Sequence, residues 1–221
     1  MKKVFITAGL VILAAVAVIT AIMLISRNSA DAPPAEAETE SRTEYTQKPS
    51  TDINVDSWLK ISDIRSHNGR LAVVAENISD TDVEYALLTV QNGDKKYTFN
   101  ASVLLRHKRV LLVCNEEADF DSTATYTLWK TENVISFTTP PSMNESTLEV
   151  KMLDGSVSVK NISGSDISTD IFIYYKTKTD GIPDGSITHR IKLSGLRDSA
   201  ETFVNAPSIT PESAEIIFTQ Y

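Results

Sequence analysis

The chain has 221 residues, and its 29 acidic and 21 basic side chains give a formal net charge of −8 at pH 7. Such an acidic protein repels polyanions, which argues against nucleic acid or anionic lipid as a general partner. The single cysteine, Cys114, excludes an intrachain disulfide. Small exported domains in oxidising compartments often use disulfides, so this composition favours the surface of a Gram-positive bacterium.

The first long segment, Val4–Ile25, contains 22 residues and no charged side chain. A helix of this length, rising about 1.5 Å per residue, would cross a hydrocarbon core of about 30 Å. A cleaved signal peptide is the alternative, because Lys2 and Lys3 form a basic start, but its apolar region is usually only about 7–15 residues long. We therefore expect residues 1–27 to form an uncleaved N-terminal transmembrane anchor.

Basic residues precede this apolar segment, whereas acidic residues predominate after it. Beyond residue 27 the chain has 18 basic and 29 acidic side chains, a net charge of −11. The positive-inside bias therefore places the N-terminus in the cytoplasm and residues 28–221 outside the membrane, while signal cleavage would instead release a secreted protein. Residues 28–51 have few large apolar side chains, so we expect a disordered linker there.

Short runs of β-branched and aromatic residues fill the rest of the chain, separated by turn residues such as Asn68-Gly69 and Asn92-Gly93-Asp94. Many short strands without a helical period predict an all-β fold of the sandwich or barrel type. The clearest strands of the first half are expected at Leu71–Val74, Val83–Val90, Tyr97–Phe99, Val110–Val113, Tyr126–Trp129 and Val134–Phe137.

An internal repeat divides this β-rich region. Val73–Val83 resembles Val157–Ile167 at a constant offset of 84 residues, and both segments contain Asn-Ile-Ser followed by Asp. Later matches pair Tyr97–Phe99 with Ile187–His189, Leu105-Arg106 with Leu196-Arg197, and Val134–Phe137 with Glu215–Phe218. We therefore predict two tandem β-sandwich units, at residues 52–140 and 143–221.

The repeated motif predicts a structural turn at the end of a strand. Asn and Ser side chains bond nearby backbone groups and so fix the entry into the next strand. The residues concerned are Asn77, Ser79 and Asp82 in the first copy and Asn161, Ser163 and Asp166 in the second.

The second copy continues into a strand that ends in Tyr174-Tyr175-Lys176, then Asp184-Gly185, Ile187–Arg190 and Gly195-Leu196. This pattern resembles the small bacterial envelope modules known for an FxLYD motif, in membrane-anchored proteins of clostridial-type bacteria. No Asp follows the aromatic pair, and His189 stands where an aromatic residue is usual. The resemblance implies an Ig-like sandwich in the cell envelope with a binding or scaffolding role, and it carries no catalytic residue.

The sequence gives no sign of catalytic or metal chemistry. The histidines His67, His107 and His189 have no metal-binding spacing, and one cysteine cannot make a zinc signature. The chain also lacks the motifs of nucleophilic hydrolases and of nucleotide-binding loops. We therefore expect no enzyme activity, no cofactor and no metal site.

One basic cluster, Arg106-His107-Lys108-Arg109, interrupts the acidic background between two apolar segments. Its simplest interpretation is a charged hairpin tip that discourages pairing of exposed strand edges. In the alternative interpretation, Arg106, Lys108 and Arg109 contact a partner such as an anionic wall polymer or lipid headgroups.

These features together predict a non-enzymatic, single-pass envelope protein whose β-sandwich repeats bind or scaffold an extracytoplasmic protein or a cell-wall component. The alternative is an accessory or sensor subunit of a membrane transport or secretion complex, which would use Val4–Ile25 as well as the sandwiches.

Overall fold

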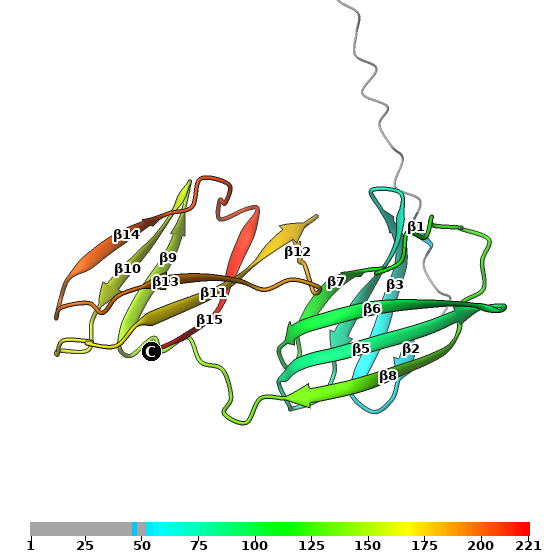
Figure 1. Ribbon diagram of the computed structural model, residues 1–221, viewed down its shortest axis with the longest axis horizontal. Helices are drawn as coiled ribbons and strands as arrows, with labels where there is room; N and C mark the ends of the chain where they lie inside the picture. Colours follow the sequence, from blue (N-terminus) through cyan, green and yellow to red (C-terminus); the bar gives the residue numbers. More distant parts are fainter. Residues whose placement is uncertain (1–45, 48–51) are drawn as a thin grey trace, which may run out of the picture. The chain divides into compact units, whose positions relative to one another are not determined.

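The computed structural model describes residues 46–47 and 52–221, and these contain strands and turns but no helix (Figure 1). The all-β prediction is confirmed for this part of the chain. The predicted anchor Val4–Ile25 and most of the predicted linker lie outside the described residues. Within the described residues, no helix has both the length and the hydropathy needed to cross a membrane.

The strands of the first half are β1 (Thr46–Gln47), β2 (Ile53–Val55), β3 (Leu59–His67), β4 (Arg70–Asn77), β5 (Val83–Asn92), β6 (Lys95–Leu104), β7 (Arg109–Val113) and β8 (Thr127–Ser136). Those of the second half are β9 (Leu148–Leu153), β10 (Ser156–Asn161), β11 (Ile171–Thr179), β12 (Ile182–Pro183), β13 (His189–Leu193), β14 (Glu201–Asn205) and β15 (Ala214–Gln220).

The described strands form four antiparallel sheets (Figure 1). Sheet I has the order β1-β3-β4-β7, with β2 also paired to β3, and sheet II has the order β6-β5-β8. Sheet III has the order β14-β10-β9, and sheet IV contains β12, β13 and β15, all paired to β11. The pairing β3-β4-β7 of sheet I thus recurs as β9-β10-β14 in sheet III, and β6-β5-β8 recurs as β13-β11-β15.

Two of the three hydrophobic clusters each unite side chains from a pair of sheets. The first unites buried side chains of sheets I and II, including Ile61, Leu112 and Phe99. The second unites side chains of sheets III and IV, including Leu148, Val159 and Ile173. The strands supply these side chains by alternation, because successive residues of a strand point to opposite faces.

Turn residues define the register of the first hairpins. Asn68 and Gly69 both have positive φ values, 52° and 81°, and they join His67 to its ladder partner Arg70. Two residues with positive φ match the right-handed twist of the flanking strands, which is why Asn-Gly is favoured there. The predicted turn is therefore confirmed.

The structure corrects several predicted elements. Thr46–Gln47 falls in the predicted disordered linker but pairs with Ile64 and Arg65 of β3, because β2 covers this edge of β3 only as far as Ile61. The two strands predicted at Tyr126–Trp129 and Val134–Phe137 are parts of one strand, β8. The basic cluster is not a hairpin tip, since β6 and β7 belong to different sheets.

The two copies also align differently from the sequence match. The ladders place Phe99 of β6 opposite Leu88 and Ile191 of β13 opposite Ile173, so Phe99 corresponds to Ile191 and not to His189. The physical reason is loop length, because only two residues join β5 to β6, whereas residues 180–188 join β11 to β13. In the last strand of each copy, Thr131 lies opposite Leu88 and Thr219 lies opposite Ile173, so the two threonines correspond. The predicted match of Val134–Phe137 with Glu215–Phe218 is therefore wrong.

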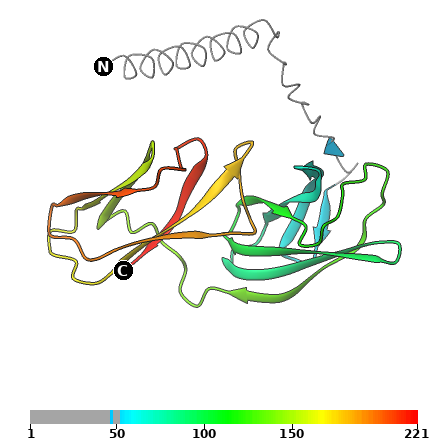
Figure 2. The same cartoon turned by 45° about the horizontal axis from the view of Figure 1, so that its top comes forward.

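Strands β4 and β7 are buried on both faces, and one of these faces packs against the second half of the chain. On the face opposite the first cluster, Ala72, Val74 and Leu111 pack with Ile182 of β12. Figure 2 shows β12 next to β7, and the bridge between Leu111 and Asp184 lies at this contact. The described strands accordingly belong to a single compact unit, Glu44–Tyr221.

Replacing Asn161 with Ala is expected to lower the free energy of unfolding by about 2–4 kcal/mol. Its buried amide donates to the carbonyl oxygens of Ser165, Leu196 and Arg197, and each buried group that loses its partner costs about 1–3 kcal/mol. Urea titration of both proteins measures the difference, with the exposed Asn205→Ala as control. Equal stability of the two variants would contradict the structural role of Asn161.

Candidate functional site

The repeated Asn-Ile-Ser motif forms the same hydrogen bonds in both copies. Asn77 donates to the carbonyl oxygens of Thr81 and Leu104 at 2.8 and 3.0 Å, and its side-chain oxygen accepts from the backbone N–H and hydroxyl of Ser79. Asn161 donates to Ser165 and Leu196 at 2.7 and 3.0 Å and accepts from Ser163 in the same way.

The acidic residue of each motif holds the backbone of a second loop. Asp82 accepts the backbone N–H of Arg106 at 2.8 Å, and Asp166 accepts that of Asp198 at 2.8 Å. Since the asparagines bond Leu104 and Leu196, each motif clamps the loop that connects its two sheets. We name these connections the basic loop, residues 105–109, and its counterpart, residues 197–201.

The two loops have the same backbone conformation at an offset of 92 residues. His107 and Ser199 both have a φ of 57°, and the carbonyl oxygens of Lys108 and Ala200 accept the backbone N–H groups of Asn77 and Asn161. Leu105-Arg106 therefore corresponds to Arg197-Asp198, one residue beyond the pairing expected from sequence.

Comparison of the two loops shows whether the turn depends on the charge of its side chains. Where the first copy has Arg106-His107-Lys108-Arg109, the second has Asp198-Ser199-Ala200-Glu201. The same turn thus forms with acidic and small residues, so the basic side chains are not required by its geometry. They call for another explanation, either solubility or contact with a partner.

The four basic side chains of the loop have different surroundings. Arg106 bonds Asp82, with 2.8 Å between Nη2 and Oδ2, and His107 contacts Asp80 at 3.1 Å. Lys108 and Arg109 are exposed and form no ion pair with any described residue. Asp82 therefore neutralises Arg106, whereas no described carboxylate neutralises Lys108 or Arg109, and Arg109 donates to the hydroxyl of Ser62 at 3.4 Å.

Lys108 and Arg109 both line a pocket of about 380 Å³, which we call the cationic pocket. Its apolar wall comes from the ends of β6 and β7, the connection to β9, β12 and β15: Val103, Leu105, Val110, Pro141, Met143, Pro183, Ile216 and Ile217. Lys176 and Glu215 complete the lining. Three basic groups against one carboxylate give this pocket the opposite charge to the protein as a whole.

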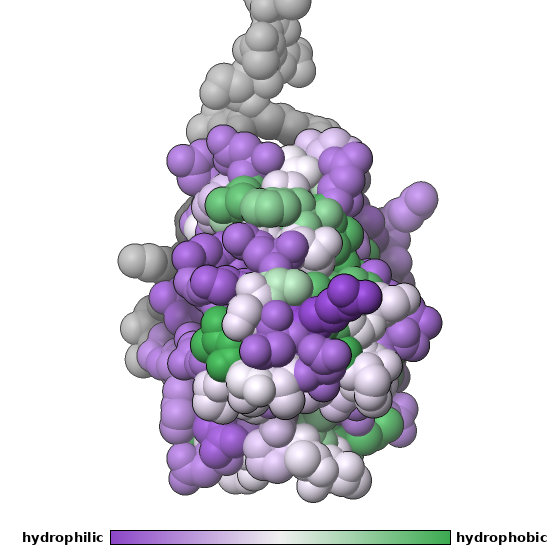
Figure 3. Space-filling view, turned by 90° about the vertical axis from the view of Figure 1, so that its left-hand side faces the viewer, coloured by the Kyte–Doolittle hydropathy of each residue, from purple (hydrophilic) through white to green (hydrophobic). Residues whose placement is uncertain are grey.

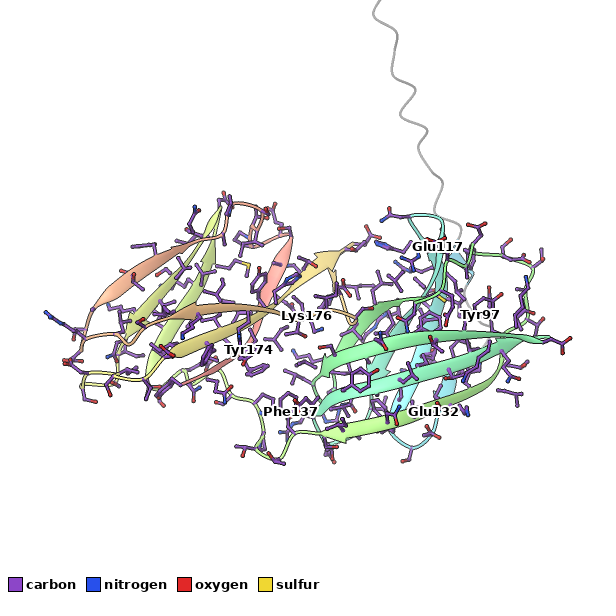
Figure 4. The ribbon with its side chains drawn as sticks, in the orientation of Figure 1. Tyr97, Glu117, Glu132, Phe137, Tyr174 and Lys176 are labelled. Carbon is purple, nitrogen blue, oxygen red and sulfur yellow. The ribbon has the colours of Figure 1, made fainter. Side chains whose placement is uncertain are left out.

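Lys176, which is labelled in Figure 4, is the buried one of the three basic residues. Only 1% of its surface is exposed. Its Nζ donates to the carbonyl oxygens of Ser102, Asp184 and Ile187 at 2.7, 2.7 and 3.1 Å. One ammonium therefore joins β6 to β11 and to the segment after β12. Because all three of its donors are used, Lys176 acts on the pocket through its position and charge.

Gly185 is required at the same contact. A Cβ atom there would lie 2.4 Å from Cδ2 of Leu112 and 2.6 Å from Cγ2 of Val110. Its backbone N–H donates to Leu111, and its carbonyl oxygen accepts from Ser102. This close approach fixes the pocket walls from both halves relative to one another.

Other surface features point less clearly to a site. On the left-hand side of Figure 1, hydrophobic side chains occur in separate groups among hydrophilic ones (Figure 3). Among residues 46–47 and 52–221, no cluster of three His, Cys, Asp or Glu side chains could hold a metal ion. Cys114 is buried, and burial raises the pKa of its thiol to about 12.

Sequence reasoning identified Arg106, Lys108 and Arg109 but not the rest of the pocket. The walls come from β12, β15 and the connection at Pro141, which lie far from the basic loop in sequence. One feature of the sequence indicated a further residue of the pocket: Lys176 directly follows two aromatic residues in an apolar strand.

The lowered pKa of Lys176 predicts that the free energy of unfolding increases at alkaline pH. Burial lowers its pKa from 10.5 to about 8, with Asp184 and Glu215 acting in the opposite direction. Between these values the unfolded chain keeps a proton that the folded protein has released, so stability rises with pH. From pH 8 to 10 the free energy of unfolding should increase by about 2–3 kcal/mol relative to Lys176→Met. A constant difference in chemical denaturation would contradict this.

Comparison of the chain with protein-family models, with curated proteins and with solved structures gives no match. The resemblance to FxLYD-type envelope modules accordingly stays a prediction from the sequence.

Proposed function

We propose that this chain is a non-enzymatic binding protein of the cell envelope, and that its cationic pocket receives a negatively charged group of an extracytoplasmic partner. In this proposal Val4–Ile25 anchors the chain and residues 28–221 lie outside the membrane. Sheets I and II form one β-sandwich module, and sheets III and IV form a second.

The observation that carries the proposal is the difference between the two equivalent loops. Their backbones are held by the same hydrogen bonds, yet only the first copy has Lys108 and Arg109, where the second has Ala200 and Glu201. Basic residues that the turn does not need, gathered at a pocket in an acidic protein, support a binding role for the loop.

The pocket also defines the kind of group it would take. Arg109 offers a planar guanidinium and Lys108 an ammonium, both suited to carboxylate or phosphate oxygens. The apolar wall would cover the aliphatic part beside such an anion, as in small ligand sites of about 300–1,000 Å³. A carboxylate attached to an aliphatic chain combines these features.

The clamp supports binding by reducing its entropic cost. Asn77 and Asp82 fix the backbone on which the two cations stand, so little loop entropy is lost when a ligand arrives. The same clamp occupies Arg106, which leaves Lys108 and Arg109 as the proposed contacts.

The double variant Lys108→Ala/Arg109→Glu tests this proposal, because it introduces the residues of the second copy. We expect the full chain to bind a fluorescent polyglutamate peptide in low salt, and the variant to bind at least tenfold more weakly. Loss of two charge-assisted hydrogen bonds, at about 1.5–3 kcal/mol each, accounts for this factor. Fluorescence anisotropy measures both affinities.

The matched control is Lys151→Ala/Lys192→Glu, which changes the net charge equally on two exposed lysines outside the pocket. It should keep most of the affinity. An equal loss in both double variants would show that net charge alone governs binding. No binding by the unmodified chain would contradict the proposal directly.

A further inference from the structure

A second hollow, which we call the aromatic cleft, lies on the other side of Val103 and Pro141 and has a volume of about 720 Å³. It shares these two residues with the cationic pocket, but its other walls are different. They come from the start of β5, the segment after β8, β11 and the end of β15. Apart from Val103, Pro140 and Pro141, the lining consists of aromatic and polar side chains, which differs from the aliphatic and basic lining of the cationic pocket.

Three aromatic rings of the cleft are held against one another. Tyr174 and Phe218 are ladder partners on β11 and β15, and their rings are parallel within 10° with centroids 4.2 Å apart. Phe137, from the segment that follows β8, meets Phe218 edge-on with centroids 5.8 Å apart. Figure 4 labels Tyr174 and Phe137 on their separate elements. Phe218 is buried and supports the partly exposed rings of Tyr174 and Phe137, which form an ordered apolar surface contributed by both halves.

Polar groups with unused hydrogen-bonding capacity surround these rings. Asn144 donates through its amide to Thr219, while its side-chain oxygen has no partner within the described residues. Gln220 accepts from the hydroxyl of Tyr174, which leaves its amide N–H groups free. Neither Glu84 nor the hydroxyls of Thr138 and Thr139 form a side-chain hydrogen bond with a described residue, so both donors and acceptors face the cleft.

The charge of the lining argues against an anionic ligand. Among the lining residues, Glu84 is the only one of the types Asp, Glu, Lys, Arg and His. Phosphates, carboxylates and nucleotides would therefore be repelled here, in contrast to the cationic pocket. A purely apolar ligand would leave the free polar groups without partners, which costs about 1–3 kcal/mol for each buried group.

We propose that the aromatic cleft binds a neutral saccharide. A sugar ring presents C–H groups on its faces, which pack on the electron-rich faces of aromatic rings, and hydroxyls at its edge. The hydroxyls both donate and accept, which matches Gln220, Asn144 and Glu84. The site is independent of the proposed anion-binding pocket, and it would give the chain a second contact with the cell envelope.

The test is isothermal titration of the full chain with the tetrasaccharides of glucose and of N-acetylglucosamine. We expect at least one of them to bind with a Kd of about 1 mM or tighter. Phe137→Ala, at a partly exposed ring, and Gln220→Ala, at an exposed amide, should each weaken binding about fivefold or more. Thermal unfolding of each variant establishes that it is folded.

Two controls separate this site from other surfaces. Phe203→Ser removes an exposed ring on β14, outside the cleft, and should leave the affinity unchanged. Lys108→Ala/Arg109→Glu should also leave saccharide binding unchanged, so the failure of one proposal does not imply failure of the other. Absence of binding to both tetrasaccharides, or unchanged affinity of folded Phe137→Ala and Gln220→Ala, would overturn the proposal. A decaproline peptide is a neutral competitor whose rings would also pack on aromatic side chains. If the chain bound this peptide and neither tetrasaccharide, the proposal would be overturned.

Discussion

The contact between the two halves of the described strands is built around the buried side chain of Lys176. Lys176 bonds three backbone carbonyls that belong to β6 and to the segment between β12 and β13. A charge without water is costly unless its donors are satisfied, so this position requires all three acceptors at once. With Gly185 packed on Leu112, the contact leaves the halves little freedom to slide. Both hollows have walls from each half, so both inherit their shape from it.

Comparison of the two copies shows which side chains the fold requires and which can vary. The asparagine clamp occurs in both copies with nearly equal distances, which identifies it as a requirement of the fold. The side chains on the clamped loops differ between the copies in charge and in size. The equivalent ladder pairs differ as well, since Tyr174–Phe218 of the second copy stands where the first has Thr89–Lys130. The candidate binding residues are those in which the copies differ on a common backbone.

Local signals in the sequence revealed the strands and the repeated motif. Asn77 and Ser79 bond each other two residues apart, and Asn68-Gly69 completes a hairpin by itself, so both can be recognised without tertiary information. The correct alignment of the later strands could not be recognised, because the segment with β12 lengthens one loop of the second copy and the connection before β8 is longer in the first copy. The pockets were also hidden, since a strand residue such as Lys176 shows its burial only when distant elements cover it.

The contrast between the two hollows follows from the position of the connection between β8 and β9. Pro141 contributes to both, so this short segment divides the space between the halves into one side with Lys108 and Arg109 and another with Glu84. Opposite charges on the two sides mean that each favours a different kind of group. Any change to Lys176 or Gly185 alters both sides together, whereas changes to the linings act on one side alone. Binding at the two sides is therefore separable by mutation even though their geometry has a single origin.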